Sequence, residues 1–240
     1  MELFSPEFFS ALLAIVVIDL VLAGDNAIVI AMAARNLPAH LQKKAIVWGA
    51  VGAIAVRSAM TLARTLSLLT INGDYVLQSK PVEQFKKQLT TEFSKEEINI
   101  KKGSEKTFVY PKLNQSQIQF NAKNKNLKLI FLNEVNDTLI LNYDAKKQTF
   151  SIDRRHSGKV NFEKSFGEKT HITPTPNLIS KTIDFQIILD WSSIEIFLNG
   201  GVYTFTEQIF PNQPYTKLTI QSTNKQEIKN IVFQSVKGIW

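Results

Sequence analysis

The first third of the chain is dominated by one apolar run. From Phe8 to Ala34 there is no lysine or arginine, and only Asp19 and Asp25 interrupt 27 otherwise apolar or small residues. A membrane-spanning helix needs about 20 such residues, whereas a cleavable signal peptide would start with a basic segment. Carboxylates inside a span usually face a helix bundle and serve cation or proton handling. Alternatively, Asp25 and Asn26 lie at a helix break near the interface. Both interpretations stay open.

A second, shorter apolar run follows a polar connection that contains three basic residues, Arg35, Lys43 and Lys44. The positive-inside tendency predicts that this connection is cytoplasmic and that the N-terminus is outside. Ala45–Val56 would cover roughly 18 Å of a hydrocarbon core about 30 Å thick. A full span must therefore continue through Arg57 to about Ala63, with the guanidinium reaching outward. We expect membrane association through residues 8–63, with the remainder on the extracytoplasmic side, or inside if this span does not insert.

The chain changes character after about residue 63. "TLSLLTINGDYVLQ" predicts a strand, a turn at Asn72-Gly73-Asp74 and a second strand, which is a hairpin pattern. Val82, Phe85, Leu89 and Phe93 share a helical period, so a short amphipathic helix or linker is expected next. Nine short apolar runs then alternate with polar clusters: 117–120, 127–132, 138–143, 150–153, 183–189, 194–198, 202–206, 218–221 and 228–236.

This pattern predicts a mainly β chain whose residues 98–240 form an antiparallel β-sandwich, preceded by an N-terminal hydrophobic, membrane-type α-helical segment. The expected divisions are a truncated helical hairpin at 1–63, a hairpin and linker at 64–97, and the sandwich at 98–240. An isolated two-stranded hairpin is marginal in water and has open edges. We therefore expect this one to be poorly ordered or to dock on the sandwich in an improvised way.

Charge and residue counts exclude several classes of site. Residues 1–63 hold four basic and four acidic groups, so the formal charge of +7 lies in the rest of the chain. There the lysines are scattered singly or in pairs, which is typical of a solvated β surface rather than a nucleic-acid footprint. The chain has no cysteine, so disulfides and thiolate chemistry are excluded. The spacing of the three histidines indicates neither a metal site nor a catalytic triad, and no cofactor is implied.

The phrase "IDLVLAGDNAIVIAMAARNLP" at residues 18–38 resembles the opening helix of the TerC-type integral membrane proteins, a bacterial family linked to tellurium resistance and manganese export. The resemblance covers about residues 1–56. It implies that cation passage would fall on Asp19 and Asp25, with Asn26 alongside. Members of that family have several further helices, and a conduit needs a closed bundle. Because this part of the chain supplies about one and a half helices, any metal site here would be vestigial.

Later phrases resemble a different family, glycoside hydrolase family 32, which includes invertases, levanases and fructan hydrolases. "RSAMTLARTLSLLTINGDYVLQSKPV" resembles the close of its catalytic propeller, although Ala63 stands where the family often has proline. "SIDRRHSG" (151–158), "LDWSSIEIFLNGG" (189–201) and "IFP" (209–211) resemble phrases of its C-terminal β-sandwich. The resemblance covers about residues 57–240. The chain therefore looks like a chimera of a TerC-type fragment and the tail of a fructan hydrolase.

The resemblance implies both a lost activity and a candidate binding site. Retaining glycosidases need two carboxyl groups about 5 Å apart, which this family carries in Asn-Asp-Pro, Arg-Asp-Pro and Glu-Cys phrases. None of these phrases occurs in this sequence, so catalysis is not expected. Related modules bind fructans through acids, arginine and aromatic faces. The candidate carbohydrate-binding residues are Asp153, Arg154, Asp190, Trp191 and Glu195.

Each candidate also has a structural interpretation. Asp153 and Asp190 each end a strand and could bond turn amides. Glu195 alternates with two isoleucines, which is the pattern of a solvent-facing strand position, and many such positions in the family support packing against the propeller. Three functions therefore remain: a membrane-tethered, non-catalytic sandwich that binds a fructan or another β-fructoside, a non-functional fusion of a transporter and a hydrolase fragment, and a working cation exporter.

Overall fold

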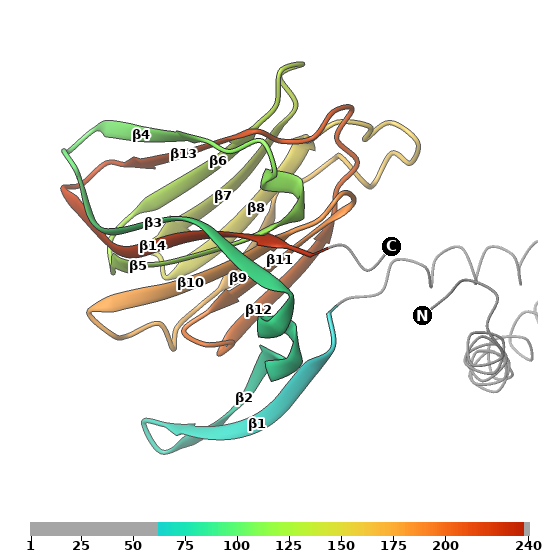
Figure 1. Ribbon diagram of the computed structural model, residues 1–240. Coiled ribbons are helices and arrows are strands. Elements are labelled where there is room, and N and C mark those ends of the chain that lie inside the picture. Colours follow the sequence, from blue (N-terminus) through green and yellow to red (C-terminus); the bar gives the residue numbers. More distant parts are fainter. Residues whose placement is uncertain (1–61, 238–240) are drawn as a thin grey trace, which may run out of the picture. The chain divides into compact units, whose positions relative to one another are not determined.

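The computed structural model describes residues 62–237, which are drawn in colour in Figure 1. The chain divides into two compact units, residues 1–60 and 61–240. The predictions for the N-terminal segment, including the membrane hairpin and Asp19, Asp25 and Asn26, lie outside the described residues. Between residues 62 and 237 no helix is long and apolar enough to cross a membrane.

Two six-stranded antiparallel sheets face each other and form a β-sandwich, as the sequence predicts (Figure 1). We call them sheet I and sheet II. Sheet I has the strand order β12-β11-β10-β5-β14-β3, with bounds β12 Tyr203–Gln208, β11 Ser193–Leu198, β10 Thr182–Leu189, β5 Ser116–Lys123, β14 Gln226–Val236 and β3 Leu89–Ile100. Sheet II has the order β4-β13-β6-β7-β8-β9, with bounds β4 Ser104–Val109, β13 Lys217–Ser222, β6 Leu127–Leu132, β7 Thr138–Asp144, β8 Thr149–His156 and β9 His171–Pro174.

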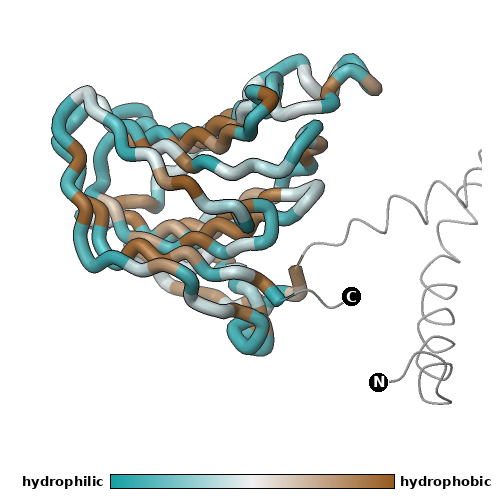
Figure 2. The backbone as a smooth tube through the Cα atoms, turned by 45° about the horizontal axis from the view of Figure 1, so that its top comes forward, coloured by the Kyte–Doolittle hydropathy of each residue, from teal (hydrophilic) through white to brown (hydrophobic). Residues whose placement is uncertain are grey.

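The core lies between the sheets because alternate side chains of each strand point inward. In β7, buried Leu139, Leu141 and Tyr143 alternate with partly exposed residues. The backbone coloured by hydropathy shows this alternation, with hydrophobic segments in the strands and hydrophilic ones in the connections (Figure 2). All nine apolar runs singled out in the sequence coincide with strands or their ends. Alternation of apolar and polar residues was therefore sufficient to locate them.

The predicted amphipathic helix or linker after the hairpin is wrong for most of its length. Residues 83–88 form a short 3-10 helix, η1 (Glu83–Gln88), and the chain then enters β3 at Leu89. A second 3-10 turn, η2, spans Leu113–Gln115. β3 pairs with β14 from Leu89 opposite Val236 to Ile100 opposite Gln226. This pairing overrides the helical spacing of the apolar residues, so the sandwich begins at about residue 89 rather than 98.

The hairpin predicted around Asn72-Gly73 is confirmed. β1 (Arg64–Ile71) pairs with β2 (Asp74–Pro81) as a separate two-stranded sheet. Asn72 has φ of 52° and Gly73 has φ of 90°, as a two-residue turn with left-handed central residues requires. Asparagine and glycine adopt this conformation at the lowest cost.

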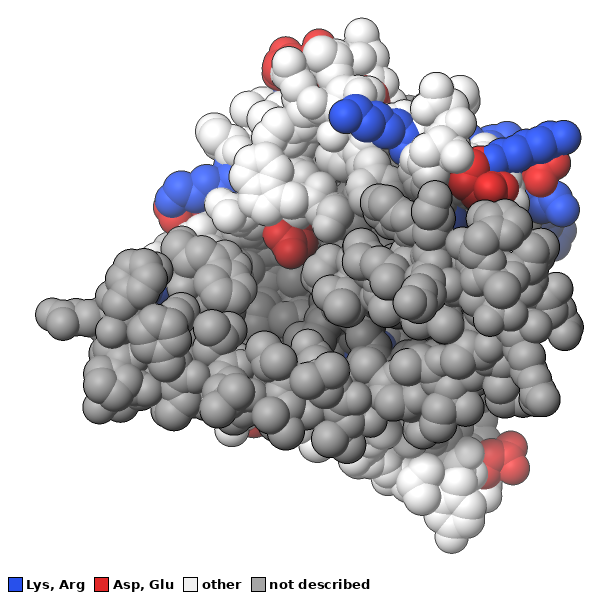
Figure 3. All heavy atoms as spheres, turned by 90° about the vertical axis from the view of Figure 1, so that its right-hand side faces the viewer, with Lys and Arg blue, Asp and Glu red and all other residues white. Residues whose placement is uncertain are grey.

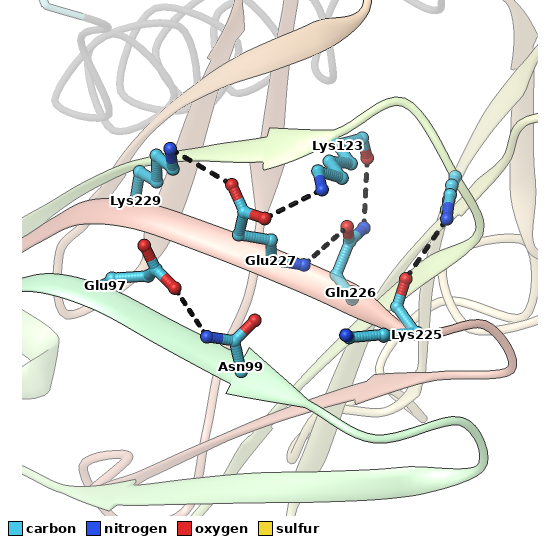
Figure 4. Close-up of polar contacts among 8 residues, drawn as sticks. Glu97, Asn99, Lys123, Lys225, Gln226, Glu227 and Lys229 are labelled. Carbon is cyan, nitrogen blue, oxygen red and sulfur yellow. Dashed lines mark hydrogen bonds and ion pairs between the residues drawn. The ribbon is translucent and has the colours of Figure 1, made fainter.

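The last strand, β14, lies between β5 and β3, so it is an interior strand of sheet I. Its outward residue Glu227 accepts hydrogen bonds from the ammonium groups of Lys123 at 2.7 Å and Lys229 at 3.1 Å (Figure 4). These hydrogen bonds lower the pKa of the Glu227 carboxyl. On the described part of the face in Figure 3, basic and acidic side chains also lie beside one another. Lys123 and Lys229 are therefore partners of a surface carboxylate.

Candidate functional site: the hairpin dock and an aromatic platform

Glu195 is buried, with 4% of its surface exposed, and it binds the hairpin. The guanidinium of Arg64 donates from Nη2 to Glu195 Oε2 at 2.6 Å, and the backbone N–H of Leu62 donates to Oε1 at 2.7 Å. Arg64 also lies over the ring of Phe197, 5.2 Å from its centroid. The interpretation of Glu195 as a solvent-facing residue is wrong, because the N-terminal end of β1 covers this face of β11.

The backbone of β2 makes the rest of the contact between the hairpin and the sandwich. We call the whole contact the hairpin dock; it consists of Leu62, Arg64 and Ser79 on one side and Glu195, Gly201 and Thr204 on the other. The N–H of Ser79 donates to the carbonyl of Gly201 at 2.9 Å, and Thr204 Oγ1 donates to the Ser79 carbonyl at 3.3 Å. Gly201 has φ of 90°, and a Cβ placed there would lie 1.9 Å from the Ser79 carbonyl oxygen. Only glycine allows the two backbones to approach this closely. The hairpin dock is therefore specific rather than improvised.

Arg154 lies at the end of β8 and is nearly enclosed by three groups. Its Nε donates to the carbonyl of Phe166 at 3.1 Å and its Nη1 to the carbonyl of Gln208 at 3.0 Å. Nη1 also pairs with Glu207 Oε2 at 3.0 Å, and the guanidinium stacks 3.8 Å above the Phe166 ring. Through Nε and Nη1, Arg154 joins the loop at 157–170 to the end of β12.

That loop carries an exposed aromatic side chain. Phe162 is 60% exposed, and its ring packs 4.6 Å from Phe166 and 5.4 Å from Phe210, measured between centroids. Gly158 has φ of 126°, and a Cβ there would lie 2.2 Å from the Phe210 carbonyl oxygen. The loop is thus held against residues 208–210 through both backbone and rings. The sequence did not single out Phe162, because Phe162 and Phe166 lie far along the chain from Phe210 of the "IFP" phrase.

Trp191 is 56% exposed at the turn between β10 and β11. Its backbone N–H donates to Asp190 Oδ1 at 2.8 Å, so this carboxylate does bond a turn amide. The next residue, Ser192, accepts a hydrogen bond from the N–H of Ile209 at 2.9 Å. Both exposed aromatic residues are therefore anchored to the same segment, residues 208–210. We call Phe162 and Trp191 the aromatic platform.

Asp153 projects from β8 on the face opposite to Arg154, because neighbouring residues of a strand alternate. Arg155 donates to its carboxylate from Nη2 at 2.6 Å, from Nε at 2.9 Å and from the backbone N–H at 3.1 Å. The side-chain hydrogen bond from Arg155 is the largest cause that lowers the pKa of Asp153. Thus the five predicted residues do not form one cluster. Glu195 belongs to the hairpin dock and Trp191 to the aromatic platform, Asp190 is bonded to the Trp191 N–H, Arg154 holds the loop of Phe162, and Asp153 lies on the other face of β8.

Glu207 is a further charged residue that the sequence did not single out. It accepts from Arg154 on one oxygen and lies 2.5 Å from His171 Nδ1 with the other, so it ties β12 to both β8 and β9. Within the part of the chain that the structure describes, no three His, Asp or Glu side chains gather as a metal site would require. The side chains described here offer hydrogen bonds and aromatic stacking.

Comparison with known proteins identifies both parts of the chain. Residues 79–236 match the model described as "Glycosyl hydrolases family 32 C terminal". This chain belongs to that family. Residues 4–109 match the "Integral membrane protein TerC family", as the predicted chimera requires. The two matches overlap at 79–109, where the structure shows the end of β2, then η1, β3 and β4.

Individual relatives agree with this division. An extracellular exo-inulinase of Aspergillus awamori is 29% identical over 173 residues, which are 70% of this chain and 32% of the relative. The uncharacterized membrane protein YjbE of Bacillus subtilis is 49% identical over 57 residues, 24% of this chain and 26% of that protein. This match and the TerC match indicate membrane association for the N-terminal part.

Solved structures show the same fold. The exo-inulinase of A. awamori superposes with a TM-score of 0.66 at 21% identity, covering 75% of this chain and 36% of its own. A variant fructofuranosidase from Schwanniomyces occidentalis, solved with fructosylnystose, gives a TM-score of 0.62 at 17% identity and covers 74% of this chain and 40% of its own. This chain thus spans about a third of the length of these hydrolases.

Proposed function

We propose that this chain is a non-catalytic β-sandwich that binds a fructan and is tethered to a membrane by residues 8–63. The family match and the relatives, among them an exo-inulinase and a levanase, support the sandwich type and the class of sugar. The sequence contains neither the Asn-Asp-Pro nor the Arg-Asp-Pro phrase of that family and has no cysteine. We therefore assign the chain binding without hydrolysis.

One observation carries the binding proposal: Trp191 and Phe162 are exposed on two loops that are both fixed to residues 208–210. Aromatic faces offer apolar area at a low entropic cost, and they suit the C–H face of a fructosyl ring. The Asp190 carboxylate beside Trp191 supplies an acceptor for sugar hydroxyls. Arg154 positions the loop and uses its Nε and Nη1 donors for that purpose. Both loops of the aromatic platform are thus attached to residues 208–210 by backbone hydrogen bonds or ring contacts.

Affinity chromatography of the detergent-solubilised full chain on immobilised levan and inulin tests this function. We expect the unmodified chain to be retained and Trp191→Ala to bind about tenfold more weakly, equivalent to about 1.4 kcal/mol. Phe162→Ala should weaken retention similarly. Tyr75→Ala removes an aromatic side chain that is 80% exposed on the hairpin, far from this platform in sequence, and serves as the matched control. No retention of the unmodified chain, or equal losses in all three variants, would refute the proposal.

A non-functional fusion is the second candidate. It is favoured by the two partial matches within one chain, which cover 26% of the membrane relative and 32% of the exo-inulinase. In that case the join near Val56 and Arg57 arose by genomic rearrangement or by assembly error. Reading the nucleotide sequence of the source DNA across codons 55–60 separates a natural fusion from an error. Retention on fructan that depends on Trp191 would rule out the non-functional interpretation.

The orientation of the sandwich is also part of this proposal. If both apolar runs cross the bilayer, the basic connection with Lys43 and Lys44 is cytoplasmic and the sandwich is extracytoplasmic. Protease added to intact cells should then degrade the sandwich. Protection of the sandwich in intact cells, with cleavage only after lysis, would place it inside and contradict this orientation.

A further inference from the structure

One end of the sandwich gathers lysines that are far apart in the sequence. In Figure 1 it is the end where β3 passes into β4 and β13 passes into β14. Six connections between sandwich strands lie here: 101–103, 124–126, 145–148, 175–181, 199–202 and 223–225. They contain no aspartate or glutamate and seven lysines, namely Lys101, Lys102, Lys125, Lys146, Lys147, Lys181 and Lys225. We call this surface the lysine end.

The strand registers bring these connections together. Ser222, the last residue of β13, is opposite Ser104, the first residue of β4. Lys123, the last residue of β5, is opposite Thr182, the first residue of β10. The starts of β6, β8 and β14 likewise pair with the ends of β7, β9 and β3. Lysines that look scattered along the sequence are therefore neighbours in the fold.

The other end of the same sandwich has a different charge balance. Its five connections are 110–115, 133–137, 157–170, 190–192 and 209–216, and together they hold four lysines and five acidic residues. Phe162 and Trp191 of the aromatic platform also lie in these connections. The excess of positive charge among the connections is therefore at the lysine end, away from the candidate fructan site.

The seven lysines of the lysine end are not used to hold the sandwich together by ion pairs. All seven are exposed, and none of them takes part in the ion pairs found within residues 62–237. Lys125 donates from its ammonium to the backbone carbonyl of Lys225 at 3.3 Å. Closely spaced, unpaired cations raise the local positive potential and attract anions.

Acidic side chains beside the lysine end are already bonded. Glu227 pairs with two lysines of the strands, as described above. Asp144 Oδ1 accepts the backbone N–H groups of residues 146 and 147, both at 3.0 Å. Glu105 accepts a hydrogen bond from a side-chain amide of β13, and burial raises the pKa of Asp184, whose carboxyl is bonded by the backbone of Gly200. These carboxyl groups leave the seven ammonium groups without an acidic partner.

A hollow of about 290 Å³ opens at the lysine end beside sheet II. Three of the connections contribute to its lining, through Gly103, Asn126 and Thr223, and Lys128 and Asn142 line it from β6 and β7. Within residues 62–237, Lys128 has no ion-pair partner and the side-chain amide of Asn142 has no hydrogen bond. The hollow thus offers an ammonium group and an amide donor to a small oxyanion.

The residue types at the lysine end favour phosphate groups over bases and sugar rings. Lysine binds phosphate as a point charge, and the six connections contain no arginine for bidentate contacts. They contain no aromatic residue either, so bases would find no ring to stack on. Sheet II extends four strand spacings from β4 to β8, about 19 Å, so the surface is too wide for one anion.

We propose that the lysine end binds a linear, base-free phosphate polymer and that the hollow beside Lys128 holds one of its phosphate groups. The lysines of the surrounding connections contact successive phosphates along the polymer. This site does not depend on the proposed fructan binding, because the residues of the two sites lie at opposite ends of the strands.

Fluorescence anisotropy of labelled inorganic polyphosphate, titrated with the full chain in non-ionic detergent at several salt concentrations, tests this inference. One triple variant removes three cations of the lysine end: Lys125→Gln, Lys146→Gln and Lys225→Gln. The matched control removes three exposed lysines at the other end, which also have no ion pair within residues 62–237: Lys159→Gln, Lys164→Gln and Lys169→Gln. Both triples change the net charge equally.

We expect the lysine-end triple to bind polyphosphate about tenfold more weakly and its slope of log affinity against log salt to be smaller by about 2. The control triple should change affinity by less than about twofold. Lys128→Gln alone should also weaken binding. Replacing the same three lysines of the lysine end by arginine keeps the charges and should preserve affinity, and unchanged melting temperatures show that the variants are folded.

Equal weakening in the two triples would assign binding to net charge and overturn the inference, as would no binding of polyphosphate by the unmodified chain. Unchanged affinity in Lys128→Gln would overturn the seat in the hollow. If single-stranded DNA binds more tightly than polyphosphate and depends on the same lysines, the partner is a nucleic acid and the assigned ligand class is wrong.

Discussion

Leu68 and Leu141 occupy equivalent places in two very different regions. Each is a leucine within an antiparallel strand pair, β1–β2 and β6–β7, but Leu68 is 68% exposed whereas Leu141 is fully buried. Local pairing is similar in both regions. What differs is the second layer: sheet II packs against sheet I, while one face of the hairpin has no facing sheet among the described residues. Strand pattern sets the direction of a side chain, and packing between layers determines its burial.

Truncating the two leucines should give the largest contrast. Leu141→Ala leaves a cavity between the sheets and should lower the free energy of unfolding by about 2–5 kcal/mol. Leu68→Ala removes an exposed side chain and should change it by less than about 0.5 kcal/mol in detergent solution. Thermal or chemical denaturation of the full chain measures both. Similar losses would mean that the hairpin belongs to the same packed core.

Two glycines with the same φ allow the hairpin dock and the hairpin turn to be tested separately. Gly201 and Gly73 both have φ of 90°, but a Cβ at Gly73 has no atom within 4 Å. Gly73→Ala should therefore cost about 1 kcal/mol of backbone strain. Gly201→Ala adds a clash with the Ser79 carbonyl and should cost about 2–3 kcal/mol by releasing the hairpin. Limited proteolysis within residues 64–83 should accelerate only in Gly201→Ala.

Removing the Arg64 guanidinium from the hairpin dock should lower the free energy of unfolding somewhat less than Gly201→Ala does. Arg64→Met leaves the buried Glu195 carboxylate with the Leu62 N–H and no guanidinium, and should cost about 2 kcal/mol. Glu195→Gln retains an acceptor for Arg64 and should cost less. Cleavage within residues 64–83, followed by mass spectrometry, reports on the hairpin directly. If Arg64→Met is cut no faster than the unmodified chain, the pair does not hold the hairpin in place.

A small, pH-dependent effect should come from a surface pair of the sandwich. Because Arg155 lowers the pKa of Asp153 below its ordinary value of 3.8, the pair contributes stability above pH 3.8 that is lost as pH falls through the lower, folded-state pKa. Asp153→Asn should therefore flatten the fall in melting temperature below pH 3.8. At pH 7 it should change the free energy of unfolding by less than about 1 kcal/mol. An unchanged acid slope would contradict this assignment.

The sequence predicted nine of the twelve strands of the sandwich and the Asn72-Gly73 turn because these depend on local patterns, and it did not single out β3, β4 and β9. It misplaced the start of the sandwich because the helical spacing of Val82, Phe85 and Leu89 is a weaker determinant than the pairing of β3 with β14. Among site residues, Trp191 and Asp190 lie where the turn pattern placed them. The partners of Glu195 and Arg154 could not be read from the sequence, since Arg64 and Gln208 are far away along the chain.

The interior position of β14 has a consequence for synthesis. β3 reaches its neighbour in sheet I only when Gln226–Val236 has been made, roughly 130 residues after β3 itself. At about 5–20 residues per second, this delay is on the order of ten seconds. Throughout this delay the backbone edges of β5 and β3 that pair with β14 have no partner strand. The nascent chain therefore needs a chaperone or a nearby surface for that interval, and stalling before codon 226 should yield an aggregation-prone product.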